Sequence, residues 1–185
     1  MRPLIIVFLV IYTQLFTSCT VTADQNEVQL DNLFNRLKET SKTEVANKLE
    51  DKIWQVWLHS GREDIDALMI KGTFLMNNYK LDDALEKFNQ VIAKDPNYAE
   101  GWNKRATAYY LLGDLVQSMK DIKKTLNLEP RHFGALSGMG LIFTQLGDHE
   151  AALRAFREVL RINPNARDAQ QQIRSLQTKI LEESI

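Results

Sequence analysis

Three prolines, Pro96, Pro130 and Pro164, stand 34 residues apart, and each follows an acidic or amide residue at the end of an apolar stretch with helical spacing. A period of this length is typical of stacked two-helix units, because each unit buries its apolar face only against its neighbours. The spacing of the prolines therefore predicts a repeat, which the other positions of the sequence can test.

Shifting the sequence by 34 residues aligns large side chains with large ones and small with small. Small residues allow two helices to approach closely, and the large ones fill the space between one helix pair and the next. Each unit is thus predicted to be a helix, a tight turn and a second helix, with proline starting the connection to the next unit. The residues that define this packing are Gly72, Ala84, Phe88, Pro96, Trp102, Ala106, Tyr109, Pro130, Gly140, Ala152, Phe156 and Pro164.

The predicted turns are Asn77-Asn78, Gly113-Asp114 and Gly147-Asp148. Glycine or asparagine can adopt the left-handed conformation that ends a helix. Aspartate can then accept the first free amide protons of the next helix.

This pattern resembles the tetratricopeptide repeat, in three units at 65–98, 99–132 and 133–166. The resemblance implies an all-α solenoid of antiparallel helix pairs that form a right-handed superhelix. Lys71 and Arg105 depart from the family, which usually has leucine there. The segments 99–107 and 129–138 are similar to small exported tetratricopeptide proteins of alphaproteobacteria.

Two further amphipathic helices are predicted in residues 24–64, from Leu30, Leu33, Phe34 and Leu37 and from Val45, Leu49, Ile53 and Trp57. Ser41 to Glu44 is typical of a capping box for the second helix, Gly61 provides its end, and Asp64 is expected to cap the first repeat. We interpret this pair as a degenerate repeat or cap that shields the open end of the solenoid. Trp54 and Trp57 would be its packing anchors.

The last segment, 167–185, is predicted to form a C-terminal capping helix. Such a cap needs one apolar face for the last repeat and a polar outer face. Ala169, Ile173, Leu176, Ile180 and Leu181 share the apolar face.

Residues 1–23 have the charged start and short apolar middle of a signal peptide. Small residues at positions 21 and 23 favour cleavage between Ala23 and Asp24. Lipidation at Cys19 and an uncleaved anchor are the alternatives. The exported part contains no Asn-x-Ser/Thr acceptor, so the periplasm of a Gram-negative bacterium is the predicted location, with an envelope lipoprotein as the alternative.

The chain has 185 residues, of which 23 are basic and 24 acidic, and its net charge of -1 argues against a nucleic-acid partner. Membrane contact is expected only if Cys19 is lipidated. A content of 44% hydrophobic residues excludes a disordered chain.

No combination of residues predicts catalysis, a metal site or a cofactor. His59, His132 and His149 lack metal-ligand spacing and are expected at helix ends or on the surface. Gly134, Gly138 and Gly140 lie within a predicted helix, whose amide protons are not available to a phosphate, so they are expected to allow close packing or to leave a shallow hollow. We therefore expect a protein that is not an enzyme.

The resemblance implies that the first helix of each unit lines a concave groove, where ligands of the family bind. A well-known subset of the family clamps a C-terminal carboxylate there, but the corresponding positions here are Met69, Thr73, Lys104, Gly134 and Gly138, so that clamp is nearly absent. The predicted groove residues are Met69, Thr73, Met76, Asn103, Lys104, Thr107, Tyr110, Ser137, Leu141 and Gln145.

Apolar side chains among amides and hydroxyls suit a peptide with apolar anchors. The predicted function is therefore a protein-interaction scaffold or adaptor in the bacterial cell envelope that binds a peptide or protein segment of unknown identity. The alternative is a membrane-anchored structural lipoprotein attached through Cys19. Self-association through the groove or the N-terminal helix pair is also possible.

Overall fold

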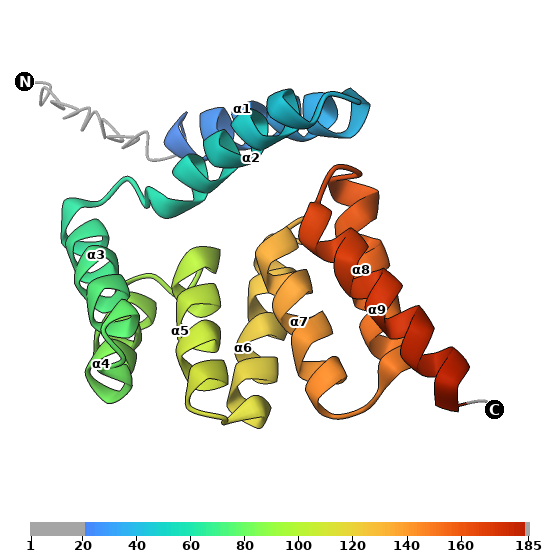
Figure 1. Cartoon of the computed structure of the whole chain (residues 1–185). Helices are drawn as coiled ribbons and strands as arrows, with labels where there is room; N and C mark the ends of the chain where they lie inside the picture. Colours follow the sequence, from blue (N-terminus) through green and yellow to red (C-terminus); the bar gives the residue numbers. More distant parts are fainter. Residues whose placement is uncertain (1–20, 184–185) are drawn as a thin grey trace, which may run out of the picture.

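The computed structural model describes the backbone of residues 21–183 and the side chains from residue 27 onward. Cys19 and most of the predicted signal peptide lie outside the described residues, and the backbone of Ala23 and Asp24 lies in the first helix. The described residues are all helical apart from short connections, which confirms the predicted all-α fold (Figure 1). The helices are α1 (Val21–Glu39), α2 (Thr43–Leu58), α3 (Glu63–Asn77), α4 (Leu81–Lys94), α5 (Ala99–Leu111), α6 (Leu115–Leu128), α7 (Phe133–Gln145), α8 (His149–Ile162) and α9 (Arg167–Glu183).

Three antiparallel helix pairs, α3/α4, α5/α6 and α7/α8, stack side by side, and α9 packs against α8 (Figure 1). Small residues at the repeat-defining positions allow this close approach. A Cβ atom on Gly72 would lie 2.6 Å from the Phe88 ring, and one on Gly140 would lie 2.7 Å from the Phe156 ring. Both phenylalanines are buried, so the rings have little room to move.

The turns of the second and third pairs follow the predicted chemistry. Gly113 and Gly147 have φ of +81° and +76°. Asp114 and Asp148 each accept an amide proton of the following helix, at 3.0 Å. The first pair differs, because Tyr79 and not an asparagine takes the left-handed conformation, with φ of +56°.

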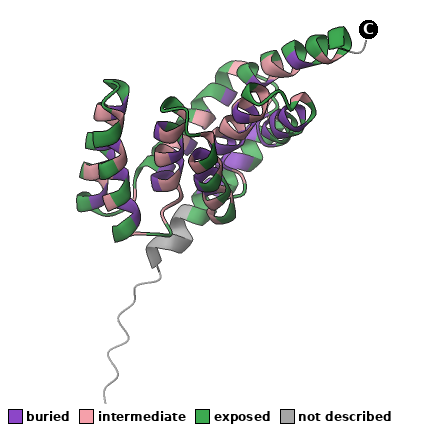
Figure 2. Cartoon of the chain, turned by 90° about the horizontal axis from the view of Figure 1, so that it is seen from below, coloured by how far each residue is buried: buried purple, intermediate pink, exposed green. Residues whose placement is uncertain are grey.

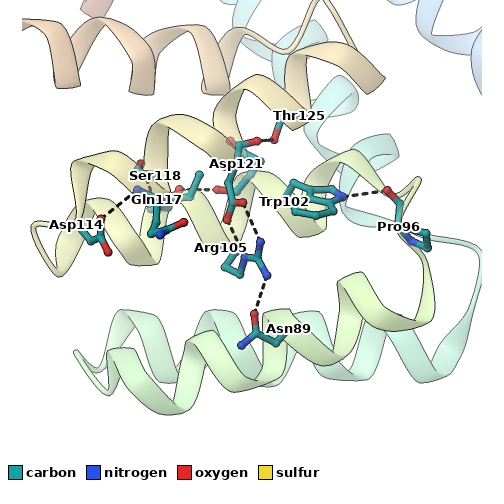
Figure 3. Close-up of polar contacts among 12 residues, drawn as sticks. Asn89, Pro96, Trp102, Arg105, Asp114, Gln117, Ser118, Asp121 and Thr125 are labelled. Carbon is teal, nitrogen blue, oxygen red and sulfur yellow. Dashed lines mark hydrogen bonds and ion pairs between the residues drawn. The ribbon is translucent and has the colours of Figure 1, made fainter.

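Arg105 is an ion-pairing residue at the boundary between the first two pairs (Figure 3). Its guanidinium donates to both carboxylate oxygens of Asp121 on α6, at 2.7 and 2.8 Å, and to Oδ1 of Asn89 on α4, at 2.7 Å. The hydrogen bonds that Arg105 donates to Asp121 raise the pKa of Arg105. The charge that replaces the family's leucine is therefore fully paired, and it fastens α5 to helices on both sides.

The N-terminal hairpin, formed by α1 and α2, does not cover the outer side of α3 as the sequence suggests. It lies across the ends of the stacked pairs, from α3 to α8 (Figure 1), and contacts α8 and α5. Leu37 and Ile53 share a core with Phe133 and Phe156 of the third pair. The hairpin is thus a bridge over several repeats, and the interpretation as an end cap is wrong.

Side chains fasten the hairpin to each of the three connections that carry the period-defining prolines. The Tyr98 hydroxyl donates to the backbone oxygen of Trp57 at 2.9 Å. Arg131 pairs with Asp31. Because the connections recur every 34 residues, they form a row on one edge of the solenoid, and the hairpin follows that row. The third connection is fastened by Asn163 to Glu50 and by Asn165 to the backbone oxygen of Thr40, both at 2.8 Å.

Two predicted caps around the hairpin are also wrong. The cap position of α2 is Lys42, without a side-chain hydrogen bond, so Ser41 and Glu44 form no capping box. Arg62 holds the cap position of α3, and Asp64 lies within its first turn. Gly61, with φ of +76°, turns the chain between the two helices.

Helix α9 covers the end of the third pair, with Ala169 and Leu176 buried. Leu181, which the sequence places on the same face, is 64% exposed. Figure 2 shows buried positions on the facing sides of the helices and exposed ones around them. Among the helices of the described residues, none has the length and apolar character to cross a membrane.

Candidate peptide-binding groove

A hollow of about 180 Å³ opens between α5 and α7. Its apolar lining includes Ala106, Ile122 and Ala135, and Gly138 keeps it open, because a Cβ atom there would already lie 3.3 Å from Ile122. The predicted groove residues that this hollow brings together are Asn103, Thr107, Tyr110, Ser137 and Leu141.

The polar groups of the hollow are not equally available to a ligand. The Thr107 hydroxyl donates to the backbone oxygen of Asn103 at 3.0 Å, and the Ser118 hydroxyl donates to that of Ala106 at 2.8 Å. Tyr110 and Ser137 are partly exposed and make no side-chain hydrogen bond within the described residues. The hollow is thus an apolar depression with two free hydroxyls at its edge.

The other predicted groove residues lie elsewhere. Met69 and Met76 are 3% and 7% exposed and belong to the core between α3 and α4. Thr73 is partly exposed on α3, and Gln145 is exposed at the end of α7. Neither residue lines the hollow. None of the predicted groove residues of the first repeat therefore contributes to it.

A buried polar cluster joins α5, α7 and the hairpin beside the hollow. Glu100 and His132 are 1% and 0% exposed, and Nε2 of His132 lies 2.9 Å from Oε2 of Glu100. Asn103 donates to the same oxygen at 3.0 Å, and Nζ of Lys104 lies 3.3 Å from Oε1. Two of the predicted groove residues, Asn103 and Lys104, are therefore engaged by Glu100.

Hydrogen bonding assigns the protonation of His132. Its Nδ1 accepts the amide proton of Ala135 at 3.1 Å and so caps α7. Because Nδ1 is an acceptor, the ring proton is on Nε2, which donates to Glu100. The imidazole ring also stacks on Trp57, with ring centroids 4.1 Å apart and planes 6° apart.

The cluster keeps Glu100 ionised. Burial alone raises the pKa of Glu100, but the hydrogen bond from His132 and the positive charge of Lys104 outweigh burial, so its pKa is lowered. The carboxylate thus compensates Lys104, which also lies 5.8 Å from the Trp54 ring centroid.

Trp54 lies against Gly134, one of the residues that line the hollow. A Cβ atom on Gly134 would lie 2.6 Å from the Trp54 ring, so the indole rests directly on the backbone of α7. Of the positions that clamp a terminal carboxylate in part of the family, Gly134 is covered, Lys104 is neutralised by Glu100 and Met69 is buried. The arrangement is unsuited to a carboxylate terminus.

All three histidines lie at helix ends, as the sequence predicts. The burial of His132 and its pairing with Glu100 were not predicted, because residues 32 positions apart show no relation until the connections stack in a row. No cluster of three or more metal-ligating side chains occurs in the described part of the chain.

A larger hollow, of about 660 Å³, lies between the hairpin and the first two connections. Its lining includes Glu27, Asp31, Asp95 and Glu129, with Arg131 paired to both Asp31 and Glu129. No sequence pattern predicts this hollow, because it exists only where the hairpin crosses the repeats.

Comparison with known proteins identifies the class. The tetratricopeptide repeat model matches residues 134–166, and a second TPR repeat model matches residues 80–113. A TPR repeat-containing protein of Rhizobium etli is 38% identical over 152 residues, which cover 82% of this chain and 74% of that protein. The chain belongs to the tetratricopeptide repeat family, whose members are typically non-enzymatic binding modules.

More distant relatives have lower identity to this chain. Hsp70-Hsp90 organizing protein 1 of Glycine max is 27% identical over 100 residues, and the match spans 54% of this chain but 18% of that protein. The first TPR of Spaghetti (RPAP3), bound to an HSP90 peptide, superposes with a TM-score of 0.61 at 23% identity, over 64% of this chain and 94% of that one. The second TPR domain of human RPAP3, in complex with an HSP70 peptide, gives 0.58 at 23% identity, over 62% and 95%. These structures share the fold.

Proposed function

We propose that this protein is a non-enzymatic interaction module that binds a peptide or protein segment in the hollow between α5 and α7. The observation that carries the proposal is the apolar hollow itself, with Tyr110, Ser137 and Leu141 around it. Its volume of about 180 Å³ suits one large apolar side chain, and the two free hydroxyls suit the adjacent peptide backbone.

The ligand differs in kind from those of the superposed domains, whose structures hold HSP90 and HSP70 peptides. Lys104 is paired with Glu100, and Trp54 covers Gly134, so neither of these two positions offers a free cation to a terminal carboxylate. The hollow instead favours an internal segment with an uncharged anchor.

In-cell crosslinking tests this proposal. A photo-reactive residue at Tyr110 should capture a defined partner, and the same residue at Val116, which is 66% exposed and outside the hollow, should not. Capture should disappear when Leu141→Asp places a charge in the hollow. Equal capture from both positions would count against the groove.

We further propose that the protein works in the cell envelope of a Gram-negative bacterium, as the apolar start of the chain and Ala23 before Asp24 suggest. Sequencing the N-terminus of protein from the periplasm should give Asp24. The alternative, a lipoprotein anchored through Cys19, predicts fatty-acid labelling that Cys19→Ala abolishes.

A further inference from the structure

Helix α3 carries an exposed apolar face at the outer end of the solenoid. Ile70 and Phe74 are 72% and 65% exposed, although they are one helical turn apart and point the same way. Glu63, Ala67 and Asn77 continue the same face at spacings of three and four residues, and all three are exposed.

Equivalent positions in the other two repeats show what packs against this face. The residues 34 positions after Ala67 and Phe74 are Gly101 and Ala108, and 68 positions after them are Ala135 and Ile142. All four are buried beneath the second helix of the preceding repeat. The positions of Ala67 and Phe74 on α3 are therefore those that receive the preceding helix in the other two pairs.

No helix of the described chain occupies this position. The N-terminal hairpin, which would be the nearest candidate, is fastened to the three connections and shares its core with α7 and α8. At the opposite end of the solenoid, α9 exposes the polar residues Gln171, Arg174 and Gln177, so a contact between α3 and this part of α9 of another copy would place apolar side chains against polar ones.

We infer that α3 is a dimerisation surface on which two copies of this chain meet, with their α3 helices antiparallel. In this arrangement Ile70 of each copy lies opposite Phe74 of the other. Joining equivalent ends buries both apolar faces, and the two-fold symmetry closes the assembly at a dimer.

The charges at the two ends of α3 are complementary in the antiparallel arrangement. Glu63 begins the helix, and Lys80 follows its end. Neither makes a side-chain hydrogen bond or an ion pair within the described residues, and both are exposed. Antiparallel packing brings Glu63 of each copy towards Lys80 of the other, whereas parallel packing places like charges together.

Tyr79 adds an aromatic ring to the edge of this surface. It is 79% exposed and holds a left-handed conformation, where Gly113 and Gly147 stand in the other repeats. A tyrosine takes this conformation less readily than glycine does. Its place beside Lys80, at the end of α3, lets the ring cover the rim of the dimer.

Sedimentation equilibrium of the purified protein, from about 1 to about 500 µM, tests the inference. This concentration range is wide because the exposed face of a single helix is a small interface, and small interfaces favour weak association. The wild type should show a monomer–dimer equilibrium. Phe74→Glu should raise the dissociation constant at least about tenfold. Val116→Glu adds the same charge at an equally exposed apolar position on α6 and should leave the constant unchanged.

A charge exchange tests the orientation. Glu63→Lys and Lys80→Glu should each weaken the dimer, and the double variant should restore it. If circular dichroism shows that Phe74→Glu lowers helicity, the charge exchange between Glu63 and Lys80 tests the dimer in its place. A wild type that stays monomeric throughout, association insensitive to Phe74→Glu, or a double variant weaker than both single ones would overturn the inference. None of these outcomes depends on the groove.

Discussion

At the scale of single residues, several charged and polar side chains pair with residues far away in the sequence. The sequence shows each of these residues but not which ones pair. Arg105 is visible as a departure from the family pattern, but its partner Asp121 lies 16 residues away on the next helix. Glu100 and His132 are 32 residues apart. Residue type shows that such groups need partners, whereas the packing of the helices and the stacking of the connections determine which partners they meet.

Glu100 provides a pH-dependent part of the stability. Because its folded pKa is lowered, its contribution is complete above the ordinary value of about 4.3 and is lost as the pH falls through the folded pKa. Urea denaturation from pH 7 to pH 3 should therefore show a steeper acid loss for the wild type than for Glu100→Gln. Parallel curves for the two proteins would exclude this role.

Glu100→Ala should be more damaging than the glutamine variant. It leaves His132 buried without its acceptor and Lys104 without its counter-charge, which costs about 3 kcal/mol in buried pairs. Urea unfolding at pH 7 measures this loss. Glu44→Ala, at the exposed pair with Lys48, is the control and should cost less than about 0.5 kcal/mol.

The glycines of α7 differ in their tolerance of a methyl group. Gly140→Ala should lower the free energy of unfolding by about 1–2 kcal/mol, because the clash with Phe156 outweighs the gain in helix propensity. Gly138→Ala, with its nearest neighbour 3.3 Å away, should be neutral or stabilising by up to about 1 kcal/mol. Thermal unfolding compares the two directly, and equal stabilities would contradict the packing described.

At the scale of elements, the helices were predictable and the position of the hairpin was not. Apolar spacing shows that α1 and α2 each bury one face, but it does not show against which surface. The hairpin lies along the row of connections because of individual contacts, such as Tyr98 with Trp57 and Asn163 with Glu50. These residues carry no pattern that marks them as partners.

Trp57 is the central anchor of the hairpin, since it stacks on His132 and contacts Phe133. Trp57→Ala should cost about 3–5 kcal/mol. It should also speed the hydrogen exchange of the Ala135 amide, because His132 loses the ring that holds it in its capping position. Leu58→Ala, at the neighbouring exposed position, should cost less than about 1 kcal/mol and leave that exchange unchanged.

At the scale of the whole molecule, the 34-residue period predicts the stack of helix pairs because each pair must bury its faces on the next. The structure brings together only some of the residues predicted to line a groove. Thr107, Tyr110 and Leu141 lie around one hollow, and their role in binding stays a prediction, whereas Met69 and Met76 are core residues and Lys104 is paired. Helical spacing places a residue on a face but does not show how deeply the neighbouring helix covers it.

The most direct test of the central claim is selection of binding peptides from a random display library, followed by measured affinities for variants of the hollow. We expect the selected peptides to share a large, uncharged apolar residue within the chain. Gly138→Leu, which fills the hollow, should weaken their binding at least about tenfold, and Val116→Leu should not. Peptides that bind equally to Gly138→Leu, or that all require a free terminal carboxylate, would contradict the account.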